Sequence, residues 1–541
     1  MQEDWLDILR SYMVIAYIFV LLPSSIASVT DKHSTTEIGF RAYRLRQFEL
    51  GGSIHGPRSS KVSWDAVSLG SEFVRKAAIL EWRDLVGKDV QNTLQAGMGA
   101  VLIIIPSELS VLNKEERQAF LNIESQLSTF DTDQAVYFVE DCQEIRLVLI
   151  QVAESGGKAP TATKQLMNAL VSNNYVLTST VTANPPVLNV KQFNVIATLT
   201  SGDSKSPTIV LSTHYDSAGL APAKAVQADS NGSGVAALLE IYVALRQFYS
   251  KGNRPRYNII FAFTAAGKYN YQGTRQFVDN LGEKEDVELS LCLDSLGNGD
   301  QLYMQVARIP KDESPVKKMF NRISYGFSSL QSMEMNHKKI NTAAETLAWE
   351  HEMFLLRKKQ AVTLTHFKDH NDPMRDSLLD TKENVDLDVL YKNTKAIVNG
   401  ILSFIYDLDE SLCADALADS VECSFVGKNV VSKERLKLFL DAVLGIPRHA
   451  EVSDTYAKFL KDVLDRYGGK TQLQPVKFSD AVIYGHTEDK ITAHVTKPAV
   501  FEIVVGLIVA VYLYLFYHFT LNLEPFLTGL IAKWSKEAQS H

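Results

Sequence analysis

A segment between Ser212 and Glu240 holds the residues whose types and spacing best fit a catalytic site. It reads STHYDSAGLAPAKAVQADSNGSGVAALLE, so a His-x-Asp pair, His214 and Asp216, follows an apolar run, and Asn-Gly-Ser-Gly leads into a helical pattern. Imidazole and carboxylate side chains are zinc ligands, and a second carboxylate can orient a ligating imidazole. The spacing is therefore typical of a metallohydrolase.

The order of motifs around this segment resembles the di-zinc aminopeptidase family, whose relatives include nicastrin, over residues 190–400. In that family two zinc ions share five protein ligands, and a glutamate is the general base for the bridging water. The resemblance assigns His214 as the first ligand, Asp216 as the residue that orients it, and Asp294 in LCLDSLG as another ligand. These are the retained positions.

Four other positions of the family's site carry substituted residues. Ser230 stands where the bridging aspartate belongs, and a hydroxyl does not bridge two zinc ions as a carboxylate does. Gly267 stands at the general base and Lys268 at the next ligand, and an ammonium group has no lone pair to donate. Asp376 replaces the last histidine. The resemblance therefore implies no catalysis, no bound metal and no other cofactor.

An active zinc metallopeptidase with atypical ligands is the alternative. His366 and His370 lie near the last ligand position in sequence, but neither is in register with it. If the site is silent, Lys268 can form a salt bridge to Asp294 or Asp229 in place of the metal charge. The metal content of the purified protein distinguishes the two hypotheses.

The elements that would position these residues form an α/β pattern. Short apolar runs alternate with helical patterns over residues 191–408, which predicts a mostly parallel sheet flanked by helices, as in zinc aminopeptidases. Sites in such sheets form at the carboxyl ends of the strands, where His214, Gly267 and Asp294 fall.

Two further units flank this aminopeptidase-like domain. Residues 40–190 contain short apolar strand candidates and predict a smaller N-terminal α/β unit, which would lie in the lumen. Residues 409–497 are polar with helical periodicity, which predicts a helical membrane-proximal region.

Both ends of the chain carry apolar segments. Residues 1–29 contain MVIAYIFVLL followed by small residues, which indicates a signal peptide or an uncleaved signal anchor. Residues 498–519 are long and apolar enough for a transmembrane helix, with 520–541 as a cytosolic tail. Gly506 and Ala510 lie four positions apart and offer a small-residue helix contact. This layout predicts a single-pass type I protein with its large domain in the lumen.

Composition narrows the class of partner. The 541-residue chain has a net charge of −8 and no run of basic residues, which argues against a nucleic-acid partner. Four cysteines are too few for a disulfide scaffold, but Cys413 and Cys423 could pair in an oxidising compartment. The only Asn-x-Ser/Thr sequon begins at Asn231, within the motif, and is expected to be buried.

A narrower resemblance covers most of the chain. The segments HYD, ADSNGSGV, GKYNYQGT, CLDSLG and HKKINTAAETLAWEHEMF, with KPAVFEI before the terminal span, resemble the nicalin family of nicastrin-like endoplasmic reticulum membrane proteins. This resemblance implies a catalytically silent scaffold or assembly subunit. The partners it implies are nodal modulator, a small multi-pass membrane protein and the translocon for multi-pass membrane proteins.

Overall fold

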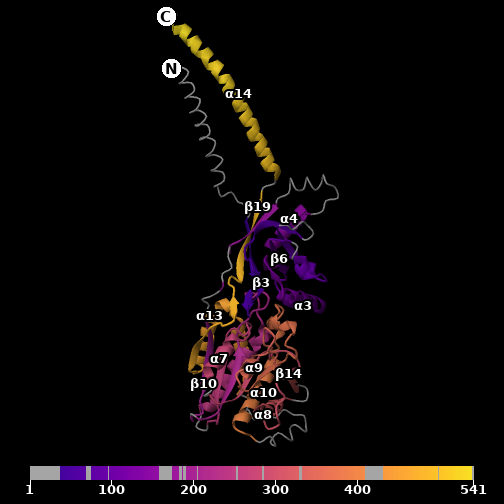
Figure 1. The fold of residues 1–541 in the computed structure, drawn as a ribbon, viewed down its shortest axis with the longest axis vertical. Helices are drawn as coiled ribbons and strands as arrows, with labels where there is room; N and C mark the ends of the chain where they lie inside the picture. The colour runs from indigo at the N-terminus through magenta and orange to yellow at the C-terminus, as the bar shows by residue number, and fades with distance from the viewer. Residues whose placement is uncertain are drawn as a thin grey trace.

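The computed structural model describes residues 37–538 except 69–74, 95–96, 157–173, 182–185, 187–190, 204, 251–253, 283–284, 328–331, 409–429 and 497–498. The expected signal segment, 1–29, and the pair Cys413 and Cys423 lie outside the described residues. The body has two units stacked along its long axis, and one long helix leaves the body at the end of the N-terminal unit (Figure 1).

The larger unit is built on an eight-stranded sheet with the order β15-β14-β16-β13-β11-β12-β10-β17. Its four central strands run parallel, and their buried apolar sequences match a sheet covered on both faces. The outer strands β10 and β14 pair antiparallel with their inner neighbours. The strands are β10 (Gln192–Leu199), β11 (Thr208–His214), β12 (Asn258–Thr264), β13 (Val287–Leu293), β14 (Gln301–Val306), β15 (Ser332–His337), β16 (Ala361–Thr365) and β17 (Thr471–Val476).

Helices cover both faces of this sheet. One face packs against a large core that includes residues of α6, α8, α10, α12 and α13, and the other packs against α7 and α9. This three-layer arrangement confirms the predicted aminopeptidase-like fold class. The helices are α6 (Gly234–Tyr249), α7 (Gln272–Leu281), α8 (Pro315–Ser324), α9 (Glu350–Leu355), α10 (Leu387–Ile405), α12 (Lys433–Leu444) and α13 (Ser453–Arg466).

The N-terminal unit is a closed barrel with the strand order β1-β19-β9-β4-β5-β6-β8. A small sheet, β18-β2-β3-β7, lies beside it. The helices of this unit are α2 (Val90–Leu94), α3 (Lys114–Ser128) and α4 (Gln143–Gly156). Its strands are β1 (Glu37–Arg44), β2 (Phe48–Leu50), β3 (Ser53–Pro57), β4 (Ser63–Ser68), β5 (Ala77–Glu81), β6 (Ala100–Ile105), β7 (Asp131–Thr132), β8 (Ala135–Glu140), β9 (Asn174–Ser179), β18 (Ala481–Ile483) and β19 (Glu488–Thr496).

The region 409–497, expected to be helical, differs from that expectation in its last part. Helices α12 and α13 are present, but residues after them form the strands β17, β18 and β19. β17 extends the large sheet beside β10, whereas β19 completes the barrel between β1 and β9. Each strand pairs with a partner hundreds of residues away. The segment therefore carries no local hairpin pattern from which these strands could be predicted.

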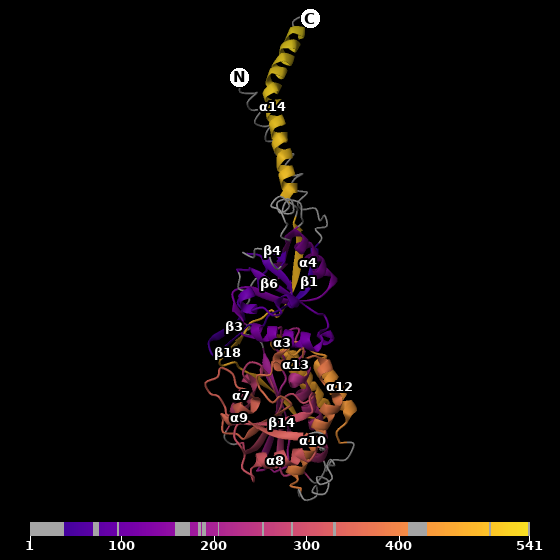
Figure 2. The same cartoon turned by 90° about the vertical axis from the view of Figure 1, so that its right-hand side faces the viewer.

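One hydrophobic cluster spans the junction between the two units. Leu220 and Ala221 of the larger unit pack with buried residues of the barrel and of α3, and so do Leu378 and Leu379. Both views place α3 at the junction between the units (Figures 1 and 2). The loops that bear the candidate site are therefore fixed from the outside by the N-terminal unit.

The long terminal helix is α14 (Ala499–Ala538), which follows β19 and points away from the body (Figure 2). Its segment Ile503–Leu521 has a mean hydropathy of 2.0, and none of it is buried in the protein. The helix therefore contains a segment long and apolar enough for the expected span, a few residues nearer the C-terminus than expected. Gly506 is open, because an added Cβ would meet no atom within 4 Å, so the proposed contact through Gly506 and Ala510 stays a prediction.

Candidate functional site

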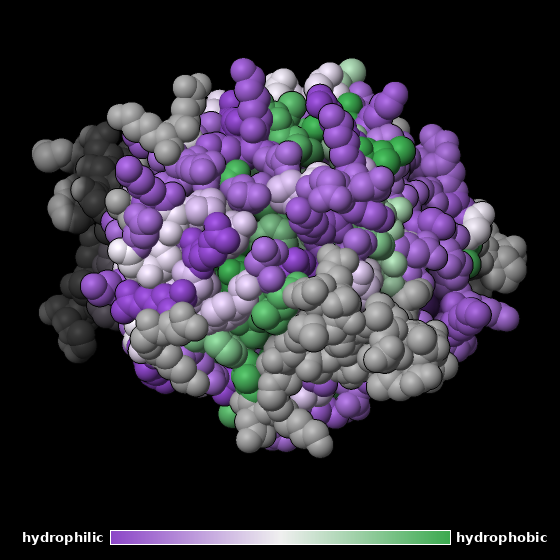
Figure 3. All heavy atoms as spheres, turned by 90° about the horizontal axis from the view of Figure 1, so that it is seen from below, coloured by the Kyte–Doolittle hydropathy of each residue, from purple (hydrophilic) through white to green (hydrophobic). Residues whose placement is uncertain are grey.

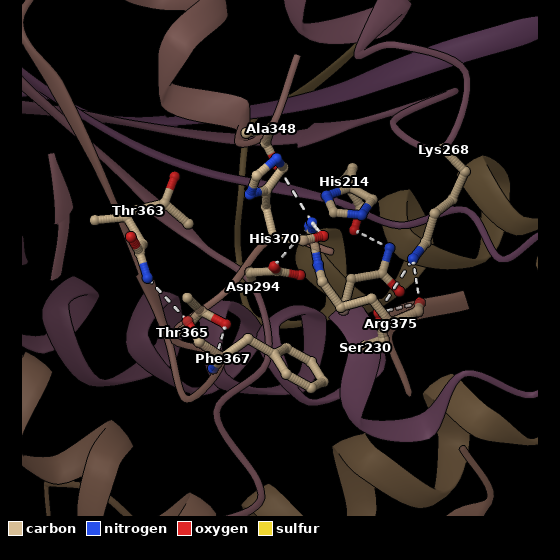
Figure 4. Close-up of polar contacts among 12 residues, drawn as sticks. His214, Ser230, Lys268, Asp294, Ala348, Thr363, Thr365, Phe367, His370 and Arg375 are labelled. Atoms are coloured by element: carbon tan, nitrogen blue, oxygen red, sulfur yellow. Dashed lines mark hydrogen bonds and ion pairs between the residues drawn. The ribbon is translucent and has the colours of Figure 1, made fainter. Parts of the chain in front are cut away.

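The retained and substituted positions meet at the carboxyl ends of the parallel strands. His214 ends β11, Asp294 directly follows β13, and Lys268 lies in the turn after β12. Ser230 lies in the irregular segment before α6, where its backbone is not helical. Figure 4 shows these side chains directed toward one another. The structure therefore brings these four residues together at one edge of the sheet.

Lys268 connects three groups around the substituted positions. Its Nζ donates to Ser230 Oγ at 3.1 Å, to the backbone carbonyl of Arg375 at 2.8 Å and to Asp376 Oδ1 at 3.0 Å. The lysine side chain is only 7% exposed. Loss of hydration alone would raise the pKa of the Asp376 carboxyl, but the charge of Lys268 holds that pKa well below its usual range. The ammonium group of Lys268 thus lies between Ser230 and Asp376, two positions that carry metal ligands in the aminopeptidase family.

A second cation, Arg375, faces the retained Asp294. One guanidinium nitrogen lies 3.2 Å from Asp294 Oδ2, and another donates to the carbonyls of Ala348 and His370. The guanidinium also stacks 4.3 Å from the centre of the Trp349 ring. Burial alone would lower the pKa of Arg375, but the Asp294 carboxylate raises it above its usual range. Sequence reasoning missed Arg375, because no family motif requires an arginine there.

His214 is buried and packs against Gly267. The exposed fraction of His214 is 2%, and burial lowers the pKa of its imidazole to about 3, so the ring is neutral. Its Nδ1 has no hydrogen-bond partner among the described residues. The carboxylate of Asp216 accepts the backbone N–H groups of Gly267 and Lys268, at 2.6 and 3.0 Å. Asp216 therefore fixes the turn after β12, instead of holding the His214 ring as the resemblance implied.

Asp229 is paired with a histidine. Its Oδ2 lies 2.6 Å from Nε2 of His366, and its Oδ1 accepts the backbone N–H of Gly297 at 2.7 Å. Burial alone would lower the pKa of His366, but the Asp229 carboxylate raises it. The expectation that Lys268 pairs with Asp294 or Asp229 is therefore wrong. Lys268 forms its ion pair with Asp376. Asp294 pairs with Arg375, and Asp229 pairs with His366.

Arg448, from the segment between α12 and α13, fixes the loops around the site. It donates to the carbonyls of Tyr215, Val226 and Gln227 and to the side-chain oxygen of Asn231. The amide nitrogen of Asn231 in turn donates to the carbonyls of His214 and Asp216. Asn231 is completely buried, as expected for the sequon. The sequence showed no sign of this role for Arg448.

A cleft of about 560 Å³ lies between the site and the N-terminal unit. Lys268, Arg375 and His370 line it from the larger unit, and Arg46 and His55 line it from the smaller one. Because Lys268 and Arg375 donate to protein oxygens, their charges are already balanced within the site.

These residues do not fit a pair of zinc ions. A zinc site needs several donor side chains converging on one point, but here an ammonium and a guanidinium lie against the carboxylates that remain. Among the residues that the structure describes, no three His, Cys, Asp or Glu side chains are grouped so as to hold a metal ion. No metal-dependent step can be built on this arrangement.

Comparisons with known proteins identify relatives that share this fold. The family described as Peptidase family M28 matches residues 194–400. The protein named BOS complex subunit NCLN of Homo sapiens is 30% identical, with 89% of each chain covered. The crystal structure of the gamma-secretase component nicastrin has a TM-score of 0.57 at 9% identity, covering 84% of this chain and 99% of that chain, which shows a shared fold.

The most informative relative covers nearly the whole chain. The protein named Nicalin of Caenorhabditis elegans is 33% identical over 98% of this chain and 99% of its own length. The match therefore includes the barrel, the aminopeptidase-like unit and the terminal helix. On this identity and coverage, the chain belongs to the nicalin family, a branch with the M28 peptidase fold.

Proposed function

We propose that this chain is a non-catalytic subunit of a membrane complex, in which a silent peptidase fold serves as a scaffold. The observation that carries the proposal is the replacement of metal charge by protein charge: Lys268 and Arg375 neutralise Asp376 and Asp294. Relatives over most of the chain are named as BOS complex subunits, which supports membership in such a complex. A span in α14 supports attachment to a membrane.

The finer assignment follows from the family resemblance. The chain would lie in the endoplasmic reticulum membrane as a single-pass type I protein, with the body in the lumen. Its partners would be nodal modulator and a small multi-pass membrane protein, near the translocon for multi-pass proteins. β19 of the barrel ends at Thr496 and α14 begins at Ala499, so the barrel is the unit of the body nearest to the span, which supports a platform at the membrane surface.

The catalytic part of the proposal is tested by metal content and hydrolysis. The purified full-length chain should contain no stoichiometric zinc by elemental analysis and should not cleave aminopeptidase substrates. An active M28 aminopeptidase purified in parallel serves as the control. Stoichiometric zinc together with chelator-sensitive hydrolysis would contradict the proposal and restore the metallopeptidase alternative.

The topological part is tested in sealed microsomes. With the body in the lumen, added protease should leave residues 37–496 intact until detergent opens the membrane. Digestion of the body in closed microsomes would show that the body faces the cytosol and would contradict this topology.

The assembly part is tested by exchanging the span. Replacing Ile503–Leu521 with an unrelated apolar helix should loosen the small membrane partner, and Gly506→Leu should do so in part if that residue is a helix contact. A folded His214→Ala variant should keep both assembly and function. If co-purification survives the span exchange while His214→Ala abolishes function, the scaffold proposal fails.

A further inference from the structure

The end of the large sheet opposite the candidate site carries a second, larger groove. Its walls are the loops 306–316 and 337–340 together with residues 355–362, and its volume is about 1010 Å³. β16 begins at Ala361 and β15 ends at His337, so the groove lies where the parallel central strands begin. It therefore faces away from the barrel and from α14. Figure 3 looks onto this end of the body, where hydrophobic residues emerge between hydrophilic ones.

The charge of the groove is opposite in sign to that of the chain. Among the residues that the structure describes, its lining includes no aspartate or glutamate, although the whole chain has a net charge of −8. None of the five lysine and arginine side chains in this lining forms an ion pair with another described residue. The nearby Glu313 points to Lys318 at 3.4 Å and is 92% exposed. The basic residues of the groove are Arg308, Lys311, His337, Lys339, Lys358 and Lys359.

Backbone geometry adds to this positive field. Helix α8 begins at the groove, with Ser314 as its N-cap and Val316 in its first turn. The N-terminus of a ten-residue helix carries a partial positive charge. This partial charge favours a carboxylate in the groove.

Apolar side chains lie between these cations. Ile309 is 76% exposed, which is unusual for an isoleucine, and Ile340, Leu355 and Val316 line the same groove. An aliphatic surface of this kind gains free energy when it is covered, at roughly 25 cal/mol per Å² of apolar area. The surface therefore offers a partner both charge and apolar contact.

We propose that this groove binds an extended acidic polypeptide segment that carries aliphatic side chains, from a partner on the same side of the membrane. β15 is the edge strand of the sheet and ends at the groove, so its outer backbone groups can pair with such a segment. This surface was not predicted from the sequence, and its binding does not depend on whether the M28 site is silent.

Two other ligands fit less well. A lipid headgroup of the membrane that holds α14 is out of reach, because α14 leaves the body at the opposite end (Figures 1 and 2). Single-stranded nucleic acid is bound by basic grooves that contain aromatic rings for base stacking, and no described Phe, Tyr or Trp lines this groove.

The test measures peptide binding to the purified full-length chain. The probe is a fluorescein-labelled peptide of alternating Leu and Glu, and the control peptide has Gln in place of Glu. Fluorescence anisotropy should show saturable binding of the Glu peptide that weakens with added salt, and at least about tenfold weaker binding of the Gln peptide.

Variants locate the binding site. Lys311→Glu combined with Lys339→Glu should weaken the Glu peptide at least about tenfold, and Ile309→Asp should also weaken it. Lys88→Glu combined with Lys437→Glu makes the same charge change at exposed positions elsewhere and should leave the affinity unchanged. Circular dichroism checks that all variants are folded.

Three outcomes would overturn the proposal. The first is no binding of the Glu peptide, and the second is equal weakening by the groove and control variants. The third is binding to vesicles of anionic lipid that the groove variants abolish, in the absence of peptide binding. None of these outcomes bears on the zinc and hydrolysis experiment, so failure here is separate from failure of the scaffold proposal.

Discussion

The ring of His214 occupies the space that a side chain at position 267 would need. A Cβ built on Gly267 would lie 2.3 Å from both Cβ and Cγ of His214. Real Cβ atoms do not approach other carbon atoms so closely, so Gly267 is required by this position of the histidine. The glycine at the general-base position is thus part of a repacked site, and replacing it with glutamate would not rebuild the catalytic one.

Gly267→Ala should therefore destabilise the protein by about 3 kcal/mol, because the added methyl overpacks a buried site. Gly445→Ala is the matched control: Gly445 follows α12 with an ordinary negative φ, and its nearest atom to an added Cβ lies 3.1 Å away. Thermal unfolding of the two variants gives the comparison. Equal melting temperatures would show that His214 moves aside without cost. Gly267→Glu should likewise be destabilised and should show no peptidase activity.

Lys268→Met should lower the free energy of unfolding by about 2 kcal/mol, because three oxygens lose the charged donor that the buried Lys268 side chain provides. Urea unfolding measures this, and the double variant with Asp376→Asn isolates the ion pair. The coupling free energy should be about 1 kcal/mol. If Lys268→Met unfolds at the same urea concentration as the parent, the lysine does not replace the metal charge in stabilising the site.

Arg448→Met should destabilise the protein by about 3 kcal/mol, since three backbone carbonyls and the buried Asn231 lose this donor. Arg448→Lys should restore little, because one ammonium group cannot reach acceptors on both sides as a guanidinium does. Lys437→Met, on the exposed face of α12, is the control and should be neutral. Unfolding of the parent and of Arg448→Met at the same temperature would refute this role.

Glu124 should make stability depend on pH. Helix α3 carries this buried residue, whose carboxylate accepts the hydroxyl of Ser377 and the backbone N–H of Leu378 across the junction of the units. Burial raises the pKa of Glu124 to about 8, although these two bonds lower it. The pKa in the unfolded chain is about 4.3, so folding costs progressively more free energy between pH ~4.3 and pH ~8, because the unfolded chain releases the proton that Glu124 retains in the fold.

Glu124→Gln removes this cost. The variant should gain stability relative to the parent as pH rises through that window, reaching about 5 kcal/mol above pH ~8, with the difference vanishing near pH ~4.3. Glu115→Gln, on the exposed face of the same helix, should show no such trend. Parallel stability curves of Glu124→Gln and the parent over this range would refute the assignment.

The sequence by itself determined the class of the fold and the place of the site. Short apolar runs and helical patterns over residues 191–408 are local, and they predicted strands that end at His214 and directly before Asp294. The motif register also identified Ser230, Gly267 and Lys268 as substitutions, and the structure brings these residues together. A long apolar run was enough to predict a span within α14.

Only the tertiary structure decided what each site residue contacts. Lys268 meets Asp376 across more than a hundred residues, and Arg448 reaches Asn231 from a segment with no recognisable motif. β19 likewise completes a barrel whose other strands lie hundreds of residues earlier in the chain. Such pairings depend on packing between distant segments. A charged side chain is buried only where an opposite charge or a carbonyl contacts it. No local sequence pattern indicates where that partner lies.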